Sequence, residues 1–478
     1  MLKLYNTYSK KLEEFKSIEE GKVRMYNCGP TVYDYVHIGN FRTYLMADFL
    51  RRTFEYLGYE VKQVKNITDV GHLTQDDIDA GEDKMLKAAR REKKSPGDIA
   101  KFYEKAFHQD EKKLNILSAH VFPKATEYID KMIEIIKVLI EKEYAYEASG
   151  NVFYDVEKFK NYGKLSGNTL EKLKTGARLE AHPNKKNSCD FALWLKAKPE
   201  HIMQWDSPWS RGYPGWHIEC SAMSMTNLEE TLDVHTGGED NVFPHHEDEI
   251  AQSEGATGKK FTNYWIHGRH LLADGEKMSK SKGNFYRLSD IETKKINPLS
   301  FRYLCLTAHF QSQLNFTWKS LKASQNALDK LYNFSQNSSP APSISSSGRG
   351  RISVLGKLSE PAVSLISDYK EKFKQALENN LDTPKALAIV WEMIKSDKIN
   401  YKDKKTALLK FDKVLGLDLD KTKKEEIEIP EKIKKLSEKR RQARENKDWT
   451  SADNLRKEIE KAGFIVEDTV GEMKIKKK

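Results

Sequence analysis

Cysteine is scarce in this sequence. The four cysteines, Cys28, Cys189, Cys220 and Cys305, are too few for a disulfide framework in 478 residues, and no two form the C-x-x-C pair of a local zinc finger. No run approaches the roughly 20 apolar residues that cross a bilayer, and residues 1–15 hold no apolar core of signal-peptide length. These absences exclude a disulfide-stabilised secreted domain, and they favour a cytoplasmic protein with no membrane partner.

The charge balance is positive. Lysine and arginine number 81 and aspartate and glutamate 71, so the formal net charge is +10. This excess suits a polyanionic partner, but it equally describes a lysine-rich solvated surface, and charge alone does not separate the two. The length allows about three domains, and an apolar content of 38% supplies the residues for a sizeable core.

The first regular unit is a strand, a turn-rich loop, a helix and a second strand. Residues 23–28 and 60–68 are typical of strands, and the helix between them is predicted over 41–57, ending at Gly58. Such a unit implies a parallel sheet, in which ligands bind at the first strand-to-helix loop. The sequence therefore predicts an α/β fold with a ligand site in residues 29–40.

The predicted sheet is interrupted and then resumed. Residues 123–146 have the most regular helical pattern, with their apolar side chains on one face, whereas residues 149–199 are irregular and polar. Strand-like segments return at 232–234 and 264–267. Beyond residues 335–350, which resemble a flexible linker or a long exposed loop, the pattern is almost wholly helical, and residues 474–478 form a lysine-rich solvated tail.

A short motif, His37-Ile38-Gly39-Asn40, precedes the first helix. Gly39 lets a ligand approach the backbone closely, and the unpaired N–H groups of a helix N-terminus suit phosphate. His37 can donate a hydrogen bond to a developing negative charge. A turn with a capping histidine explains the same four residues, and alone the motif does not exceed that simpler interpretation.

A second motif, residues 277–281, reads Lys-Met-Ser-Lys-Ser between glycine-containing turns. Lys277 and Lys280 on a mobile loop can fold over a triphosphate and neutralise charge on departing pyrophosphate. The simpler interpretation is a basic surface loop, which two isolated lysines would favour.

The two motifs together resemble the class I aminoacyl-tRNA synthetases. The resemblance implies a Rossmann-type parallel-sheet catalytic domain split by an insertion and followed by a mostly helical C-terminal region. It makes His37, Lys277 and Lys280 the expected catalytic residues, although Asn40 stands where the family usually has a histidine. The expected parts are the catalytic domain (residues 1–122 and 205–260), the insertion (123–204), a loop and stem-contact region (261–320), a helical bundle (321–415) and an anticodon-binding region (416–478).

Within that class, longer blocks resemble the cysteinyl-tRNA synthetase family. They are residues 26–34, 215–223 and 243–250, with further similarity at 449–463. The resemblance implies a monomeric enzyme that activates L-cysteine with ATP and Mg²⁺ to cysteinyl-adenylate and pyrophosphate, and then transfers the cysteine to tRNA(Cys).

The same resemblance implies one zinc ion at the floor of the amino-acid pocket. The residues that match its ligands are Cys28, Cys220, His245 and Glu249. A helix from Pro244 would put His245 and Glu249 on one face, but Asp248 lies within the same turn and rivals Glu249. His246 is expected to point elsewhere, toward the nucleotide or behind the ligands. A soft thiolate binds zinc strongly and a hydroxyl does not, so zinc would separate cysteine from serine without an editing site.

The resemblance also assigns substrate contacts. The expected cysteine-binding residues are Gly29, Thr68, Trp216, His235 and Asp240, and the expected ATP-binding residues are His37, Gly39, Asn40, Gly237, Gly238, Lys277 and Lys280. Trp216 standing alone would instead read as a core aromatic. Thr236 replaces a glycine that the family often has, and Cys305 is expected in the core.

Two other functions stay open at this point. One is a ligase that joins cysteine to an amino sugar through the same adenylate, and the helical region after Pro430 argues against it. The other is an RNA-binding module without activity, against which both intact motifs argue.

For the tRNA, the candidate contacts are Lys439, Arg440, Arg441, Arg444 and Trp449, which a charged helix face with a packing tryptophan would also explain.

Overall fold

The computed structural model describes residues 1–71, 73–75, 80–168, 183–199, 201–279, 282–336, 360–420, 430–446, 448–469 and 472–477. Lys280 and most of the predicted linker at 335–350 lie outside these residues. The chain divides into two compact units, Met1–Leu419 and Asp420–Lys478, which are described separately. No helix in the described part of the chain combines the length and the apolar character needed to cross a membrane.

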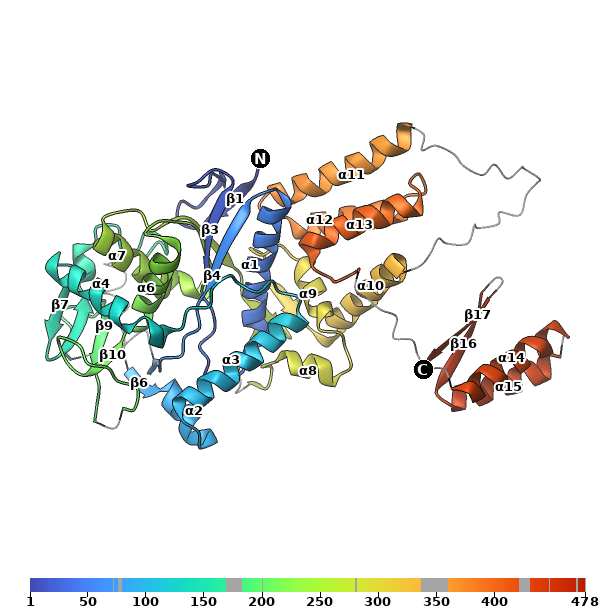
Figure 1. Ribbon diagram of the computed structural model, residues 1–478, viewed down its shortest axis with the longest axis horizontal. Coiled ribbons are helices and arrows are strands. Elements are labelled where there is room, and N and C mark those ends of the chain that lie inside the picture. Colours follow the sequence, from blue (N-terminus) through green and yellow to red (C-terminus); the bar gives the residue numbers. More distant parts are fainter. Residues whose placement is uncertain are drawn as a thin grey trace. The chain divides into compact units, whose positions relative to one another are not determined.

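A four-stranded parallel sheet forms the centre of the first unit (Figure 1). Its strand order is β12 (Thr262–Gly268), β11 (Leu232–Gly238), β3 (Lys22–Asn27) and β4 (Glu60–Lys65). Parallel pairing of Val234 with both Met25 and Tyr264 fixes the register at its middle. The predicted α/β fold with a split parallel sheet is therefore confirmed. The sheet includes β12, so it extends beyond residue 260, where the sequence placed the end of the catalytic part.

Helices cover both faces of this sheet. Figure 1 shows α1 (Ile38–Tyr56) on one side and α6 (Trp216–Leu228) with α7 (Glu247–Thr257) on the other. Helix α1 begins three residues earlier than predicted, because the ring of His37 caps it by accepting hydrogen bonds from two of its first N–H groups. Since α1 follows β3 directly, its N-terminus lies at the carboxyl edge of the sheet.

The inserted segment differs from its prediction. The helix expected over 123–146 is a 3-10 turn (Ala125–Glu127) followed by α4 (Ile129–Glu141), and the chain then turns at Glu143, whose φ is +62°. The predicted apolar face of α4 is buried. The helix ends early because the next residues pair as a strand.

The region predicted as irregular, 149–199, contributes to an antiparallel sheet. Its strand order is β10 (Gly212–Pro214), β9 (Phe191–Lys196), β8 (Asn151–Tyr154) and β7 (Ala145–Ala148). Phe191 to Leu195 are all buried, so β9 lacks the alternation by which a strand is recognised in a sequence. This antiparallel sheet extends to Pro214, beyond the expected boundary at 204, and Phe191 and Trp194 pack into the same hydrophobic cluster as Trp265 of β12.

The remaining elements of the first unit extend around this framework. The helices are α2 (Lys84–Glu92), α3 (Pro96–Lys113), the 3-10 helix Val156–Lys158, α8 (Leu288–Thr293), α9 (Leu299–Leu306), α10 (Trp318–Gln336), α11 (Glu360–Glu378), α12 (Thr383–Lys395) and α13 (Tyr401–Leu415). The strands are β1 (Lys3–Asn6), β2 (Lys11–Glu14), β5 (Leu73–Gln75), β6 (Ala80–Asp83), β13 (Leu271–Ala273), β14 (Glu276–Lys277) and β15 (Leu314–Phe316). Cys305 on α9 is buried, as expected.

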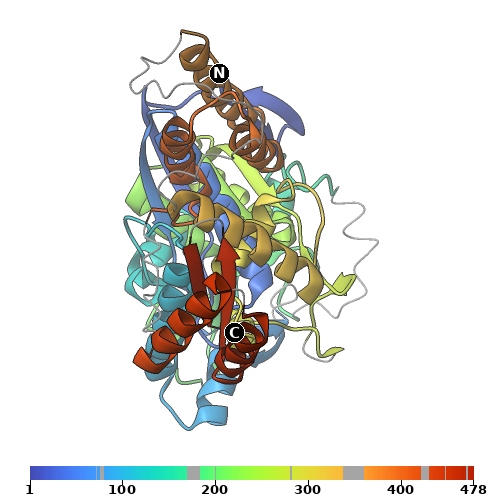
Figure 2. The same cartoon turned by 90° about the vertical axis from the view of Figure 1, so that its right-hand side faces the viewer.

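The second unit is small and not wholly helical. Helices α14 (Glu431–Glu445) and α15 (Trp449–Lys461) lie beside a hairpin of β16 (Phe464–Thr469) and β17 (Glu472–Lys477), as Figure 2 shows. The predicted lysine-rich tail is thus largely a strand.

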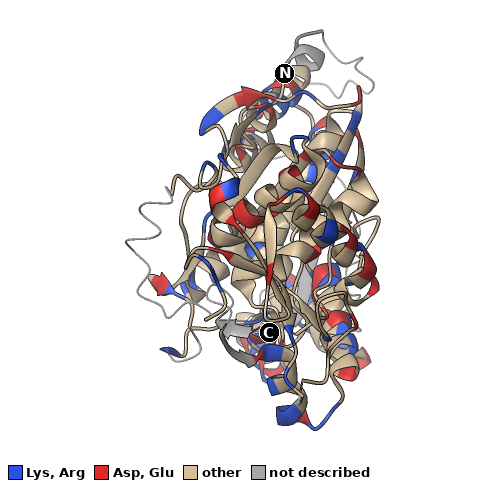
Figure 3. Ribbon diagram, turned by 90° about the vertical axis from the view of Figure 1, so that its left-hand side faces the viewer, with Lys and Arg blue, Asp and Glu red and all other residues tan. Residues whose placement is uncertain are grey.

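Two of the proposed tRNA-contacting residues of this unit are affected by its packing. Arg440 is only 4% exposed, which argues against the phosphate contact expected of it, whereas Trp449 is 58% exposed and carries the Arg444 guanidinium over its ring. In the first unit, Figure 3 shows Lys and Arg interspersed with Asp and Glu along the ribbon. The net positive charge alone therefore does not mark a binding surface.

Candidate active site and metal centre

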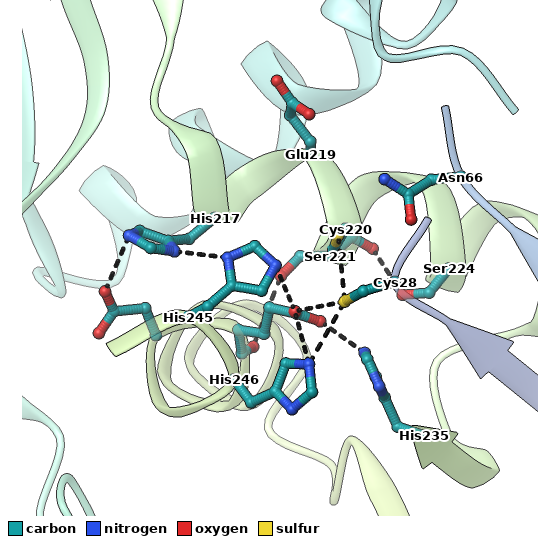
Figure 4. Close-up of polar contacts among 12 residues, drawn as sticks. Cys28, Asn66, His217, Glu219, Cys220, Ser221, Ser224, His235, His245 and His246 are labelled. Atoms are coloured by element: carbon teal, nitrogen blue, oxygen red, sulfur yellow. Dashed lines mark hydrogen bonds and ion pairs between the residues drawn. The ribbon is translucent and has the colours of Figure 1, made fainter. Parts of the chain in front are cut away.

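Four side chains from three separate segments meet beneath the carboxyl edge of the parallel sheet (Figure 4). Cys28 follows β3, Cys220 lies on α6, and His245 and Glu249 flank the start of α7. The two sulfur atoms are 3.9 Å apart, His245 Nε2 is 3.1 Å from Glu249 Oε1, and that oxygen is 3.8 Å from Cys28 Sγ. All four ligand atoms lie within 4.8 Å of one another.

This donor set fits a zinc ion. In a tetrahedral site the ligand atoms are about 3.5 Å apart, close to the distances found here. Two thiols, an imidazole and a carboxylate are all zinc ligands, and three of the four residues are fully buried. The residues that the resemblance assigned to the metal are therefore brought together, and Asp248 is not among them.

A second group of potential ligands overlaps the first. Cys28 and Glu249 also lie within 4.8 Å of His235 and His246. The Nε2 atom of His246 is 3.3 Å from Cys28 Sγ, and its Nδ1 is 2.7 Å from His267 Nε2. His246 was expected to lie behind the ligands or toward the nucleotide; its contact with Cys28 makes it a potential ligand itself (Figure 4).

Asp248 instead orients His245 through a neighbouring histidine, His217. His217 Nδ1 lies 2.8 Å from His245 Nδ1, and His217 Nε2 lies 3.3 Å from Asp248 Oδ2. Tyr162, from the insertion, donates to the other oxygen of Asp248 at 2.5 Å. This chain of contacts occupies Nδ1 of His245 and leaves its Nε2 directed at the ligand cluster.

Burial and mutual contact shift the titration of these groups. Burial raises the pKa of the Cys28 thiol well above its usual value, whereas the hydrogen bond with Cys28 lowers the pKa of Cys220 to about 7. Burial alone would lower the pKa of His245, but the charges of Glu249 and Cys220 outweigh it and raise that pKa to about 9. Burial and the neighbouring histidines lower the pKa of His246.

A cavity of about 330 Å³ opens beside Cys28. It extends between the loop after β3, the N-terminus of α1 and the loop after β11. Among the predicted residues, those that line it are Cys28, Gly29, His37, Asn40, Trp216, Gly237, Gly238 and Asp240. Cys28 thus belongs both to the ligand cluster and to the cavity, and it connects the candidate metal centre to a space of substrate size.

Glycines allow the backbone to close around this cavity. A Cβ at Gly29 would lie 1.7 Å from the carbonyl oxygen of Asn66, and one at Gly237 would lie 2.5 Å from the ring of His246. No larger residue fits at either position without displacing a neighbour. Gly29 in addition donates its N–H to Asn66 Oδ1 at 2.7 Å.

Thr68 and His235 differ from their predicted place. Both are buried and neither lines the cavity. Thr68 donates to Glu219 Oε2 at 3.0 Å, and His235 Nε2 is 2.9 Å from Glu249 Oε2. Neither Glu219 nor Glu249 lines the cavity either, so both predicted residues lie behind its wall.

The two sequence motifs, residues 37–40 and 277–281, meet at the start of α1 through Gly39 and Met278. His37 accepts hydrogen bonds at Nδ1 from the N–H groups of Gly39 and Asn40, at 3.0 and 3.3 Å, so its Nε2 carries the donor hydrogen of a neutral ring. A Cβ at Gly39 would lie 2.4 Å from the terminal methyl of Met278. Met278 lies between the two predicted lysines, and Lys277 itself is exposed on β14.

Comparison with known proteins assigns the family. The description "tRNA synthetases class I (C) catalytic domain" matches residues 14–326, and "Cysteinyl-tRNA ligase anticodon binding domain" matches residues 427–474. A cysteine–tRNA ligase of Treponema denticola is 46% identical, with 100% of this chain and 99% of that protein covered. Cysteine–tRNA ligase 1 of Burkholderia lata is 42% identical, with 98% of this chain and 95% of that protein covered. The chain belongs to the cysteine–tRNA ligase family.

Membership makes the chain a class I aminoacyl-tRNA synthetase and confirms the family resemblance seen in the sequence. A solved methionyl-tRNA synthetase from Mycobacterium tuberculosis, bound by methionyl-adenylate, has the same fold, with a TM-score of 0.57 over 83% of this chain and 90% of that one. At 14% identity this likeness concerns the fold alone.

Sequence reasoning missed other residues of this synthetase's cavity. They include Tyr33, Asp34, Thr43, Asn241 and Phe285; Tyr33 and Asp34 lie in the family-like block 26–34 but were given no role in the site. Asp34 and Phe285 come from distant segments that meet at the cavity wall. A signal existed for Asp34, since a carboxylate in the loop after a β-strand of such a sheet is a candidate ligand contact.

Proposed function

We propose that the chain activates L-cysteine with ATP and transfers it to tRNA(Cys). The observation that carries the proposal is that Cys28 joins a zinc-type ligand cluster to the cavity at the N-terminus of α1. One end of the cavity thus suits a thiol, and the other suits phosphate. The amino acid and the nucleotide would meet between them.

The first reaction forms an acyl-phosphate bond. A carboxylate oxygen of cysteine attacks the α-phosphorus of ATP, and the bond to the bridging oxygen breaks to release pyrophosphate. Positioning and charge stabilisation supply most of the catalysis of such a transfer. His37 would donate from Nε2 to a phosphate oxygen, since its Nδ1 is committed to capping α1. Lys277 and Lys280 would neutralise the departing pyrophosphate, with Mg²⁺ bound by ATP.

The second reaction moves cysteine to the tRNA. A hydroxyl of the terminal ribose attacks the carbonyl carbon, and AMP leaves with both bonding electrons. Gly237 and Gly238 would let the nucleotide approach the protein backbone closely. Trp216, whose ring centroid is 5.8 Å from Lys84 Nζ, would border the amino-acid end of the cavity. Asp240, exposed at the rim, would contact the substrate amine or ribose.

Cys28, Cys220, His245 and Glu249 would hold the zinc ion. When bound, zinc would take the cysteine sulfur as a thiolate, an interaction that the hydroxyl of serine does not match. The chain's own contribution is to keep His245 Nε2 directed at the cluster through His217 and Asp248, and to present Cys28 to the cavity.

The proposed partners follow from the parts of the chain. The second unit would bind the anticodon end of tRNA(Cys), and the region after β12 would contact its stem. We further propose a monomer that works in the cytoplasm. The four-helix region α10–α13 would connect the catalytic part to the anticodon-binding part.

Pyrophosphate exchange with each amino acid tests the activation step. L-cysteine should support exchange, L-serine should not, and zinc measured in the same sample should approach one ion per chain. A metal-free active preparation would refute the role of zinc.

Lys277→Ala should slow adenylate formation on the order of 10²-fold and leave cysteine affinity unchanged.

Charging of tRNA(Cys) tests the transfer step. Cysteine activation without charging would favour an amino sugar as the acceptor. Absence of activation altogether would favour an RNA-binding protein without activity. Removal of residues 430–478 should abolish charging and leave cysteine-dependent exchange intact. That result would support the assignment of the second unit to tRNA binding.

A further inference from the structure

One buried asparagine, Asn284, makes hydrogen bonds to the segment that carries Lys277. Asn284 is 8% exposed and bonds three main-chain groups. Its Oδ1 accepts from the N–H of Ser279 at 2.8 Å, and its Nδ2 donates to the carbonyl oxygens of Lys277 and Ala273, each at 3.3 Å. Because Ser279 supplies an N–H, the orientation of the amide is fixed by its partners.

These three groups belong to different parts of the loop. Ala273 ends β13, Lys277 ends β14, and Ser279 follows β14. The asparagine therefore connects the outgoing and the incoming arms across the turn at Asp274 and Gly275. Removing the side chain would break all three of these hydrogen bonds at a buried position.

The residues after Asn284 are fixed to the helix that carries the other motif. The N–H of Ile38 donates to the carbonyl oxygen of Tyr286 at 3.0 Å, and His37 pairs with Arg287 in an antiparallel bridge. The Arg287 guanidinium is 3.1 Å from Asp34 Oδ1, and Asp34 lines the cavity. Asn284 thus lies at the point where a chain anchored to α1 meets the lysine-bearing strand.

We infer that Asn284 is a positioning residue for adenylate formation, an inference that rests on the proposed function. Its hydrogen bonds connect the backbone of Lys277 to the segment that is attached to α1 at His37 and Ile38. The lysine and the histidine are therefore held in fixed positions relative to each other when they approach the nucleotide. A displacement of about 1 Å of such a group costs on the order of 10²-fold in rate. The transfer to tRNA needs no pyrophosphate stabilisation, so the two reactions should respond differently.

Three variants separate positioning from simple destabilisation. Asn284→Ala removes all three hydrogen bonds. Asn284→Asp keeps the oxygen that accepts from Ser279 but has no N–H group for Lys277 and Ala273. Asn227→Ala is the matched control, since Asn227 also makes two side-chain hydrogen bonds, to Tyr128 and Met223, away from the cavity.

The test measures both steps in single turnovers. Adenylate formation should fall about tenfold or more in Asn284→Ala and by an intermediate factor in Asn284→Asp, while transfer from preformed adenylate and the cysteine dissociation constant should stay at the wild-type values. Trypsin should also cleave after Lys277 faster in Asn284→Ala, a readout independent of activity. Asn227→Ala should match the wild type throughout.

Two results would overturn the inference. One is an unchanged rate of adenylate formation in folded Asn284→Ala, and the other is an equal fall in both steps, which would indicate general damage. Failure of the proposed function appears differently, as a wild-type protein that shows no cysteine-dependent pyrophosphate exchange.

Discussion

Arg302 places its guanidinium Nη2 2.5 Å from Asp48 Oδ2, and both side chains are almost completely removed from solvent. Arg302 lies on α9 and Asp48 on α1, the helix that starts at the nucleotide motif. The same guanidinium donates to the carbonyl oxygen of Leu415 at the end of α13. One buried cation therefore links the catalytic helix to the chain segment that leads toward the second unit.

Replacing Asp48 by asparagine should destabilise the first unit strongly. The change leaves Arg302 buried without its counter-charge, and breaking a buried pair in this way costs about 3–5 kcal/mol. Thermal unfolding followed by circular dichroism measures the effect. Glu55→Gln on the same helix removes a partly exposed partner of Arg51 and should cost less than about 1 kcal/mol. Equal melting temperatures for wild type and Asp48→Asn would contradict the prediction.

Acid should narrow the difference in melting temperature between the wild type and Asp48→Asn. Burial raises the pKa of Asp48, but the charges of Arg302 and Arg52 outweigh burial and hold that pKa below the usual 3.8. Stability gained from the ionised carboxylate is therefore fully present above pH 3.8 and is lost as the pH falls through the lowered pKa. Melting temperatures measured from pH 7 downward should stay separated until below pH 3.8; convergence already near pH 5 would exclude this carboxylate as the cause.

Replacing Cys220 by serine should remove bound zinc and cysteine activation together. A hydroxyl is a poor zinc ligand, and Cys220 is the second of two thiols in the cluster. Metal analysis of the purified variant and cysteine-dependent pyrophosphate exchange measure the two effects. Cys189→Ser serves as the control, because Cys189 belongs to neither ligand group. Retention of a full equivalent of zinc would remove Cys220 from the site.

Replacing His246 by glutamine should distinguish the two overlapping ligand groups. An ion held by Cys28, Cys220, His245 and Glu249 would remain in this variant at about one per chain, whereas an ion held by the group containing His246 would be lost. X-ray absorption at the zinc edge counts sulfur neighbours independently: two are expected for the first group and one for the second. A single sulfur neighbour in the wild-type protein would assign the ion to the second group.

Replacing Gly29 by alanine should slow cysteine-dependent pyrophosphate exchange on the order of 10²-fold with the metal retained. The added carbon would lie 1.7 Å from the Asn66 carbonyl oxygen, so the loop after β3 must move, and a displacement of 1 Å or more costs on the order of 10²-fold in rate. Gly97→Ala is the matched control, because a Cβ there meets no atom within 4 Å. Near-normal pyrophosphate exchange in Gly29→Ala would show that the loop yields without cost.

The sequence predicted the parts of the site that are local in the chain. The loop after β3 and the helix at His37 follow from a strand–helix–strand pattern. His245 and Glu249 were assigned by family resemblance, and their spacing alone left Asp248 as a rival to Glu249. Cys28 and Cys220 were joined to them only by family resemblance, since nothing in the spacing of two cysteines 192 residues apart shows that their sulfurs meet.

The errors arose where contacts are non-local. Strand β9 is buried along its length, so its residues carry no alternation, and the insertion read as irregular. His246 was expected to point elsewhere because helical geometry was assumed from Pro244, whereas Phe243 is extended and α7 begins only at Glu247. Asn284 had no recognisable role, because the three groups that it bonds become neighbours only when the loop has folded.

Cys28 is the one member of the first ligand group that borders the cavity, while Cys220, His245 and Glu249 lie behind it. A chelator added to the zinc form would therefore extract the ion by the same route along which cysteine arrives. A non-hydrolysable adenylate analogue would obstruct that route, so the half-time of zinc extraction would become a direct gauge of how much of the enzyme is occupied.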